Sequence, residues 1–103
     1  MTTAISRGGV PIRLTDERWA HILEEHGELR GSLERVMDAI REPDRVLAGH
    51  AGELLALKEV EKGKALVAVY RELNPEDGFV ITAFLTRRLG SLERRPQRWP
   101  PKR

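Results

Sequence analysis

The stretch KALVAVYRELNPEDGFVITAFLTR, residues 64–87, decides the fold of this chain. Two apolar segments, 64–73 and 78–87, are rich in β-branched and aromatic residues, and the turn-forming sequence of residues 74–78 joins them. A link this short joins antiparallel strands, because parallel strands need a crossover of about a dozen residues or more. The stretch therefore predicts the antiparallel centre of a β-sheet.

Two more strands are predicted immediately before this pair, at residues 45–50 and 53–61. Ala51-Gly52 and Lys62-Gly63 are short turn-like links, so each of these strands should also run antiparallel to the next. Together the four segments predict a four-stranded antiparallel meander.

Two helices are predicted before the sheet, at residues 16–26 and 32–41, because apolar side chains recur there at helical spacing. The first begins after the N-cap Thr15, and the second ends before Pro43. The apolar positions of the two helices are Trp19, Ile22, Leu23 and His26, and then Leu33, Val36, Met37 and Ile40. The predicted fold class is α+β, with the two N-terminal helices packed on one face of the meander sheet.

The chain of 103 residues suits one domain. We predict a flexible N-terminal arm at residues 1–9, a single α+β domain at 10–88 and a basic Pro/Arg-rich tail at 89–103.

The segment ALVAVY is apolar at every position and FVITAFL at every position except Thr82, which is typical of strands covered on both faces. Two short helices cover only one face of a sheet. The pattern therefore predicts a second cover, which is the tail with Trp99, a partner, or a second subunit in a homo-oligomer.

Composition excludes several classes of protein. The chain has no cysteine, which excludes disulfides and thiolate chemistry, and 33% of its residues are charged, as in globular proteins. No apolar run reaches the roughly 18 residues of a membrane span, and the N-terminus lacks the apolar region of a signal peptide. We expect a cytoplasmic protein with no membrane partner.

The charge is unevenly distributed along the chain. Seven Lys or Arg residues and one acidic residue lie from Arg87 onward, so this end carries +6 while the rest carries −4. A basic end on an acidic body is a possible electrostatic footprint for nucleic acid. The alternative is a solubilising terminus.

The segment HILEEH, residues 21–26, holds two of the three histidines. His21 and His26 are five residues apart, so they diverge by about 140° on a regular helix and cannot chelate one ion. We expect no metal site and no cofactor. The alternatives for each histidine are a structural role or an acid–base role, and His50 has no nearby partner in the sequence.

Several polar residues interrupt the apolar strands and could meet a histidine. They are Lys58, Arg71, Thr82 and Thr86. Metal-free RNA cleavage needs a base for the ribose 2′-OH, an acid for the leaving 5′-oxygen, and fixed donors that stabilise the charged transition state. Histidine suits the first two roles near neutral pH, and Arg, Lys and Thr suit the third.

The sequence around these residues resembles the phage-associated nuclease-like families grouped with barnase, EndoU, colicin-type tRNA nucleases and RelE toxins. The resemblance covers residues 12 to 88 and rests on four pieces: Trp19-Ala20-His21-Ile22 with His26, Pro43-Asp44, Tyr70-Arg71-Glu72, and Ile81-Thr82-Ala83-Phe84-Leu85-Thr86. It implies a barnase-like or RelE-like fold and a toxin-type, metal-independent endoribonuclease. Gly27 follows His26 where many such relatives have proline.

The resemblance implies that His21 or His26 is the acid–base residue and that Arg71 holds the scissile phosphate. Lys58 and Thr82 would support the phosphate, and Thr86, Arg87 and Arg88 complete the expected substrate-binding set. The expected partners are RNA, as ribosome-bound mRNA or tRNA, and an inhibitor protein or antitoxin. The alternative function is an inactive nucleic-acid-binding or protein-binding module of the same fold.

Overall fold

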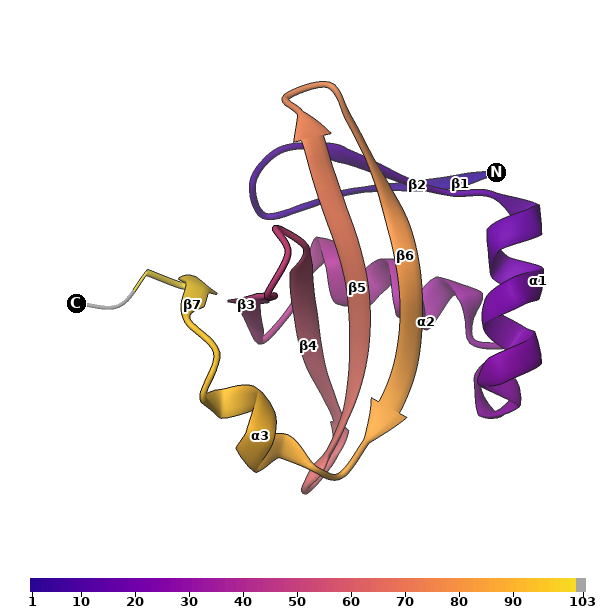
Figure 1. Cartoon of the computed structure of the whole chain (residues 1–103). Helices are drawn as coiled ribbons and strands as arrows, with labels where there is room; N and C mark the ends of the chain where they lie inside the picture. Colours follow the sequence, from indigo (N-terminus) through magenta and orange to yellow (C-terminus); the bar gives the residue numbers. More distant parts are fainter. Residues whose placement is uncertain (102–103) are drawn as a thin grey trace.

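The computed structural model describes residues 1–101, which form one sheet and three short helices (Figure 1). The helices are α1 (Asp16–Glu25), α2 (Leu33–Arg41) and α3 (Leu89–Glu93), with a 3-10 turn, η1 (Gly27–Leu29), after α1. The strands are β1 (Thr2–Ile5), β2 (Pro11–Leu14), β3 (Arg45–Ala48), β4 (Leu54–Glu61), β5 (Lys64–Asn74), β6 (Asp77–Thr86) and β7 (Gln97–Trp99). None of the three helices is long and apolar enough to cross a membrane.

The sheet has seven strands in the order β1-β2-β6-β5-β4-β3-β7, so the predicted four-stranded antiparallel meander is wrong. Among strands β3 to β6, each strand does run antiparallel to the one that follows it in the chain, as the short links require. However, β2 pairs parallel with β6, where Ile12 lies opposite Gly78. The short-link argument constrains only consecutive strands, whereas β2 and β6 are separated by two helices and three strands.

The two outer strands come from the segments that were predicted to be an arm and a tail. β1 pairs antiparallel with β2 and buries Ala4, and β7 pairs antiparallel with β3, where Trp99 lies opposite Val46. The arm and the tail also meet, since the guanidinium carbon of Arg7 lies 4.3 Å from the centroid of a Trp99 ring. This distance is typical of a cation–π contact.

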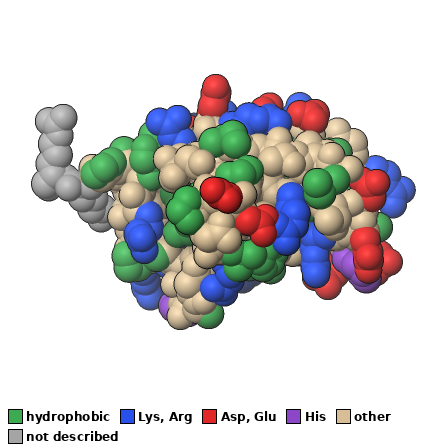
Figure 2. Space-filling model, turned by 90° about the horizontal axis from the view of Figure 1, so that it is seen from above, with side chains coloured by type: hydrophobic (Ala, Val, Ile, Leu, Met, Phe, Trp, Pro, Cys, Tyr) green, Lys and Arg blue, Asp and Glu red, His purple; other side chains and the backbone are tan. Residues whose placement is uncertain are grey.

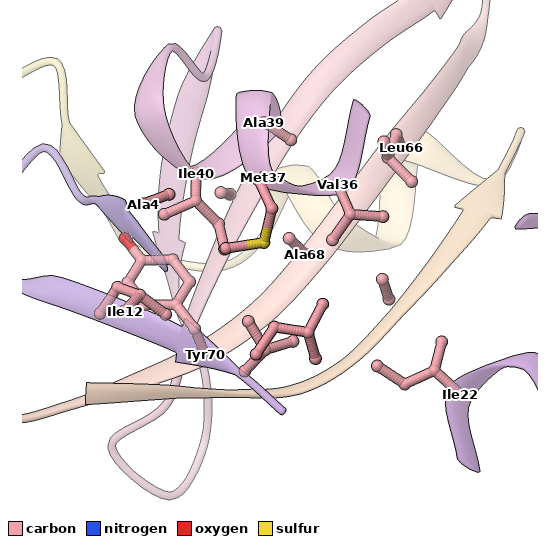
Figure 3. Close-up of a cluster of buried hydrophobic side chains, with 14 of the residues drawn as sticks. Ala4, Ile12, Ile22, Val36, Met37, Ala39, Ile40, Leu66, Ala68 and Tyr70 are labelled. Atoms are coloured by element: carbon pink, nitrogen blue, oxygen red, sulfur yellow. The ribbon is translucent and has the colours of Figure 1, made fainter. Parts of the chain in front are cut away.

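The main core lies on the face of the sheet that carries α1 and α2. Thr15 caps α1 by accepting a hydrogen bond from the Arg18 N–H, which fixes where the first helix begins. Side chains of α2 point toward β5, where they meet residues from β1 and β2 (Figure 3). The best-buried members of this core include Ala4, Ile12, Ile22, Val36, Met37, Ile40, Leu66, Ala68 and Tyr70.

A second, smaller core lies on the opposite face, and α3 covers it. Its buried members are Leu47, Leu55, Leu57, Val67 and Leu92. The tail thus supplies the expected cover for β3, β4 and part of β5, although Trp99 packs against the main core instead. In Figure 1 α3 lies at the β3 side of the sheet, and no helix crosses in front of β6.

Candidate functional site

Part of the second face, over β5 and β6, is left without a helix, and we call it the open face. The register places Val67 opposite Phe84, Val69 opposite Thr82, and Arg71 opposite Phe79. Because directly opposed side chains share a face, these residues lie on the same side as the second core. The open face consists of Val69, Arg71, Phe79, Thr82, Phe84 and Thr86, all of them partly exposed.

Both phenylalanines of the chain, Phe79 and Phe84, lie on the open face and are partly buried. The Arg13 guanidinium carbon lies 5.8 Å from the Phe79 ring centroid, and Arg13 also pairs with the carboxylate of Asp77. Sequence reasoning missed these two rings because it searched the strands for polar residues. The signal was available, since Phe84 lies two residues from both Thr82 and Thr86 and therefore shares their face.

His26 lies at the edge of the open face, beside β6. It ends α1, its backbone N–H donates to the Ile22 carbonyl at 2.7 Å, and its ring centroid lies 6.0 Å from that of Phe84. Its Nδ1 is 3.6 Å from a carboxylate oxygen of Glu28, and the side chain is 29% exposed. His26 is therefore accessible and has a carboxylate beside one ring nitrogen, an arrangement that suits an acid–base residue.

Arg71 lies at the other end of the open face and is held by the loop between β3 and β4. Its Nη2 donates to the Ala51 carbonyl at 2.8 Å. Gly52 has a φ of +88°, and a Cβ there would lie 3.0 Å from Arg71 Nη1. The glycine thus allows both the tight loop and the close approach of the guanidinium.

His26 and Arg71 share a face but do not share one small site. Arg71 is four residues along β5 from Val67, the residue opposite Phe84, and this separation corresponds to about 13 Å. The guanidinium also extends away from β6, toward Ala51. The geometry does not place both residues on one phosphate.

Two other predicted site residues lie away from the open face. Lys58 is opposite Leu66 of the main core, and its Nζ donates to the Glu42 carbonyl at 2.9 Å, next to the end of α2. His21 is on the outer side of α1, 57% exposed, within 4.0 Å of Glu17 and 3.8 Å of Glu24. Neither residue lies on the open face with Arg71.

The remaining predicted residues lie at the end of β6 that leads into α3. Thr86 Oγ1 accepts a hydrogen bond from the Arg88 N–H at 3.0 Å, which shapes this turn. Arg87 pairs with Glu61 at 2.7 Å, and that carboxylate also lies 3.8 Å from Lys64 Nζ. Thr86 is close to the His26 end of the open face, whereas the charge of Arg87 is offset by Glu61.

On the face seen from above, charges of both signs are mixed, and acidic and basic side chains lie side by side (Figure 2). Near Arg71, the Glu53 carboxylate accepts a hydrogen bond from the Ala51 N–H at 2.8 Å. This bond and one from its own backbone lower the pKa of Glu53, and the nearby Arg71 and Arg95 lower it further.

Within residues 1–101, no three His, Asp or Glu side chains gather as a ligand set for a metal ion. Comparisons of the chain with protein-family models, with curated proteins and with solved structures found no match.

Proposed function

We propose that the protein binds single-stranded RNA on the open face. One observation carries the proposal: two partly exposed phenylalanine rings lie on an uncovered sheet surface, with Arg71 and Arg13 at one end of it. Sheet-face aromatics stack on unpaired bases, and neighbouring arginines contact the phosphates.

The spacing of the two rings favours a strand of several nucleotides over a single base. Phe79 is opposite Arg71 and Phe84 is opposite Val67, so the rings are about 13 Å apart along the strands. Val69 and Thr82 form the surface between them. Two bases can therefore stack on separate rings while the backbone between them crosses a partly apolar surface.

An unpaired strand suits this surface better than a duplex. A duplex hides the faces of its bases, and its grooves are read by protruding helices, ribbons or loops. The open face is a sheet surface whose rings are accessible only to bases that have left a stack.

Fluorescence anisotropy with an unstructured labelled RNA, in EDTA, tests the proposal. We expect Phe79→Leu and Phe84→Leu each to weaken binding by about tenfold, because leucine keeps apolar volume but cannot stack on a base. Arg71→Met should weaken binding and reduce its dependence on salt.

Lys58→Met is the matched control. Like Arg71, Lys58 is a strand cation that donates one hydrogen bond to a backbone carbonyl, but it lies on the opposite face of the sheet. Equal loss of affinity in the two variants would contradict the open face as the binding surface. So would unchanged affinity in both phenylalanine variants.

Metal-independent cleavage of that RNA is the second candidate function, and the position of His26 favours it. In this reaction the 2′-oxygen attacks phosphorus and the bond to the 5′-oxygen breaks, which leaves a 2′,3′-cyclic phosphate. His26 would take the 2′-OH proton while water protonates the leaving 5′-oxygen, or protonated His26 would supply that proton while water accepts the one from the 2′-OH. Glu28 would orient its ring. Thr82 and Thr86 are the nearest hydroxyl groups on that face for the phosphate.

Cleavage is tested by incubating total RNA and tRNA with the protein in EDTA and analysing the product ends. We expect cyclic phosphate ends that disappear in His26→Ala and persist in His21→Ala, whose histidine lies on the outer side of α1. Binding without cleavage, with the two histidine variants indistinguishable, would leave the binding module as the function. Ribosome-bound mRNA and an inhibitor protein are further proposed partners, to be tested in the same assay.

A further inference from the structure

We infer that a hollow between the end of β3 and the end of α3 binds a phosphate group. The hollow has a volume of about 370 Å³ and is lined by Ala48, Gly49, His50, Ser91, Arg94, Arg95 and Pro96. Its lining brings together two guanidinium groups, an imidazole and a hydroxyl from segments far apart in the sequence. No Asp or Glu is among these lining residues.

Arg95 supplies the observation that points to a ligand. Its Nη1 is buried and has no hydrogen-bond partner, and it is the only such side-chain nitrogen or oxygen found in residues 1–101. A buried donor without an acceptor is costly, particularly when it carries charge. Arg95 also lines the hollow, and an anion there would satisfy this donor once the guanidinium turns Nη1 toward it.

The backbone around the hollow is held in place before any ligand arrives. The Ala48 N–H donates to the Pro96 carbonyl at 2.8 Å, and the Gly49 N–H donates to the Glu53 carbonyl at 2.8 Å. The Arg95 N–H donates to the Leu92 carbonyl at 3.0 Å, which closes α3. The two segments that carry the lining side chains are therefore fixed to each other, and little ordering remains for binding to drive.

The charge around the hollow is positive. One carboxylate, Glu53, lies within the influence of both Arg71 and Arg95, which help to keep it ionised. Arg94 adds a third guanidinium at the wall of the hollow. Glu93, the residue before Arg94, pairs with Arg45. The single negative charge of Glu53, which Arg71 shares, cannot neutralise both Arg94 and Arg95, so an anion is favoured there.

A phosphate group matches these donors better than a carboxylate does. Its several oxygens point in different directions, and here the donors come from two separate segments, residues 91–95 and His50. Arginine pairs with phosphate through two parallel hydrogen bonds. The hollow is also larger than a phosphate ion alone, which leaves room for the sugar of a phosphate monoester.

The inference does not rest on the proposed function of the open face, because the hollow lies beside α3 and shares none of its lining residues with that face. Two sources offer the same chemistry, a free mononucleotide and the phosphorylated end of an RNA strand. Arg71 donates to the residue that follows His50, so an RNA end held in the hollow could continue onto the open face.

NMR of the labelled full chain, titrated with inorganic phosphate at constant ionic strength, tests the inference. We expect saturable amide shifts at residues 48–50 and 91–95, and no comparable shifts with chloride. Arg95→Met should weaken phosphate binding by about tenfold or more. The matched control is Arg30→Met, which removes an exposed arginine directly after η1 that does not line the hollow and should leave affinity unchanged.

The absence of saturable shifts in the wild-type chain would overturn the inference, and this result does not depend on how the variants fold. Equal affinity in Arg95→Met and Arg30→Met would overturn it as well. Adenosine 5′-monophosphate, adenosine, and a short RNA with or without a 5′-phosphate then distinguish the sources. Tighter binding of the phosphorylated RNA than of the mononucleotide would assign an RNA end, and equal binding would assign a free nucleotide.

Discussion

Arg71 and Lys58 are both cations next to apolar strand residues, yet their side chains lie on opposite faces of the sheet. Alternation along one strand is visible in the sequence, and it correctly groups Thr82 with Thr86. The alternation does not show which residues of neighbouring strands share a face, because that depends on register. Only the pairing of Lys58 with Leu66 and of Arg71 with Phe79 separates the two cations.

His50 shows the other limit of reading a sequence at the scale of residues. It has no polar partner nearby in the chain, so its local pattern predicts no site. In the structure it shares a hollow with Ser91, Arg94 and Arg95, which the tail brings back beside β3. Contacts between segments this far apart produce no short-range pattern in the sequence. They can be recognised only once the position of the tail in the fold is known.

Tyr70 is predicted to make the protein less stable at alkaline pH. Burial of its hydroxyl raises its pKa well above the ordinary value, and the nearby Glu72 carboxylate raises it further. The unfolded chain releases this proton near pH 10, whereas the folded chain retains it. Above about pH 10, ionisation of the tyrosine therefore stabilises the unfolded state relative to the folded state. The free energy of unfolding should fall by up to about 1.4 kcal/mol per pH unit.

Urea unfolding of the wild type and of Tyr70→Phe at increasing pH measures this contribution. The variant should lose less stability above pH 10 than the wild type, because it has no phenol to ionise. Tyr70 is the only tyrosine in the chain, so phenolate absorbance reports on it directly. Ionisation of the folded chain near pH 10, with identical pH profiles for both proteins, would contradict the prediction.

At the scale of elements, the strongest sequence patterns correspond to the elements that form. The predicted helix at 16–26 is α1, the predicted helix at 32–41 is α2, and the four predicted strands are β3 to β6, with ends displaced by a few residues. In each of these predicted segments the apolar side chains are numerous enough to reveal a helix or a strand. By contrast, β1, β7 and α3 have three to five residues each, too few for a period to be recognised.

The element α3 is predicted to be part of the core even though its sequence resembles a solvated tail. Leu92 is 8% exposed and packs in the second core, so Leu92→Ala should lower the free energy of unfolding by about 2 kcal/mol. Leu73→Ala is the matched control, because Leu73 is 51% exposed and its truncation should change stability by less than about 0.5 kcal/mol. Chemical denaturation of the two variants measures the difference, and equal stability would mean that α3 contributes no packing.

At the scale of the whole molecule, the tail changes the argument for association. The unbroken apolar pattern of residues 65–70 predicted a second cover for the sheet, and α3 provides it within one chain over Leu57 and Val67, which are 3% and 0% exposed. What remains uncovered is the narrower open face, which combines rings with polar side chains. The β4 and β5 part of the surface that suggested a homo-oligomer is therefore buried in the monomer, whereas its β6 part belongs to the open face.

The full chain is accordingly expected to be a monomer, and a chain ending at residue 88 is expected to self-associate. Removal of α3 and β7 would expose the apolar side chains of the second core, a continuous surface that soluble monomers rarely present. Light scattering after gel filtration measures both masses. The full-length variant Leu92→Ser removes the apolar contact of α3 with the second core but keeps the charge of the tail. It should self-associate more than the wild type. A dimeric full chain that becomes monomeric on truncation would instead place the subunit interface on the tail.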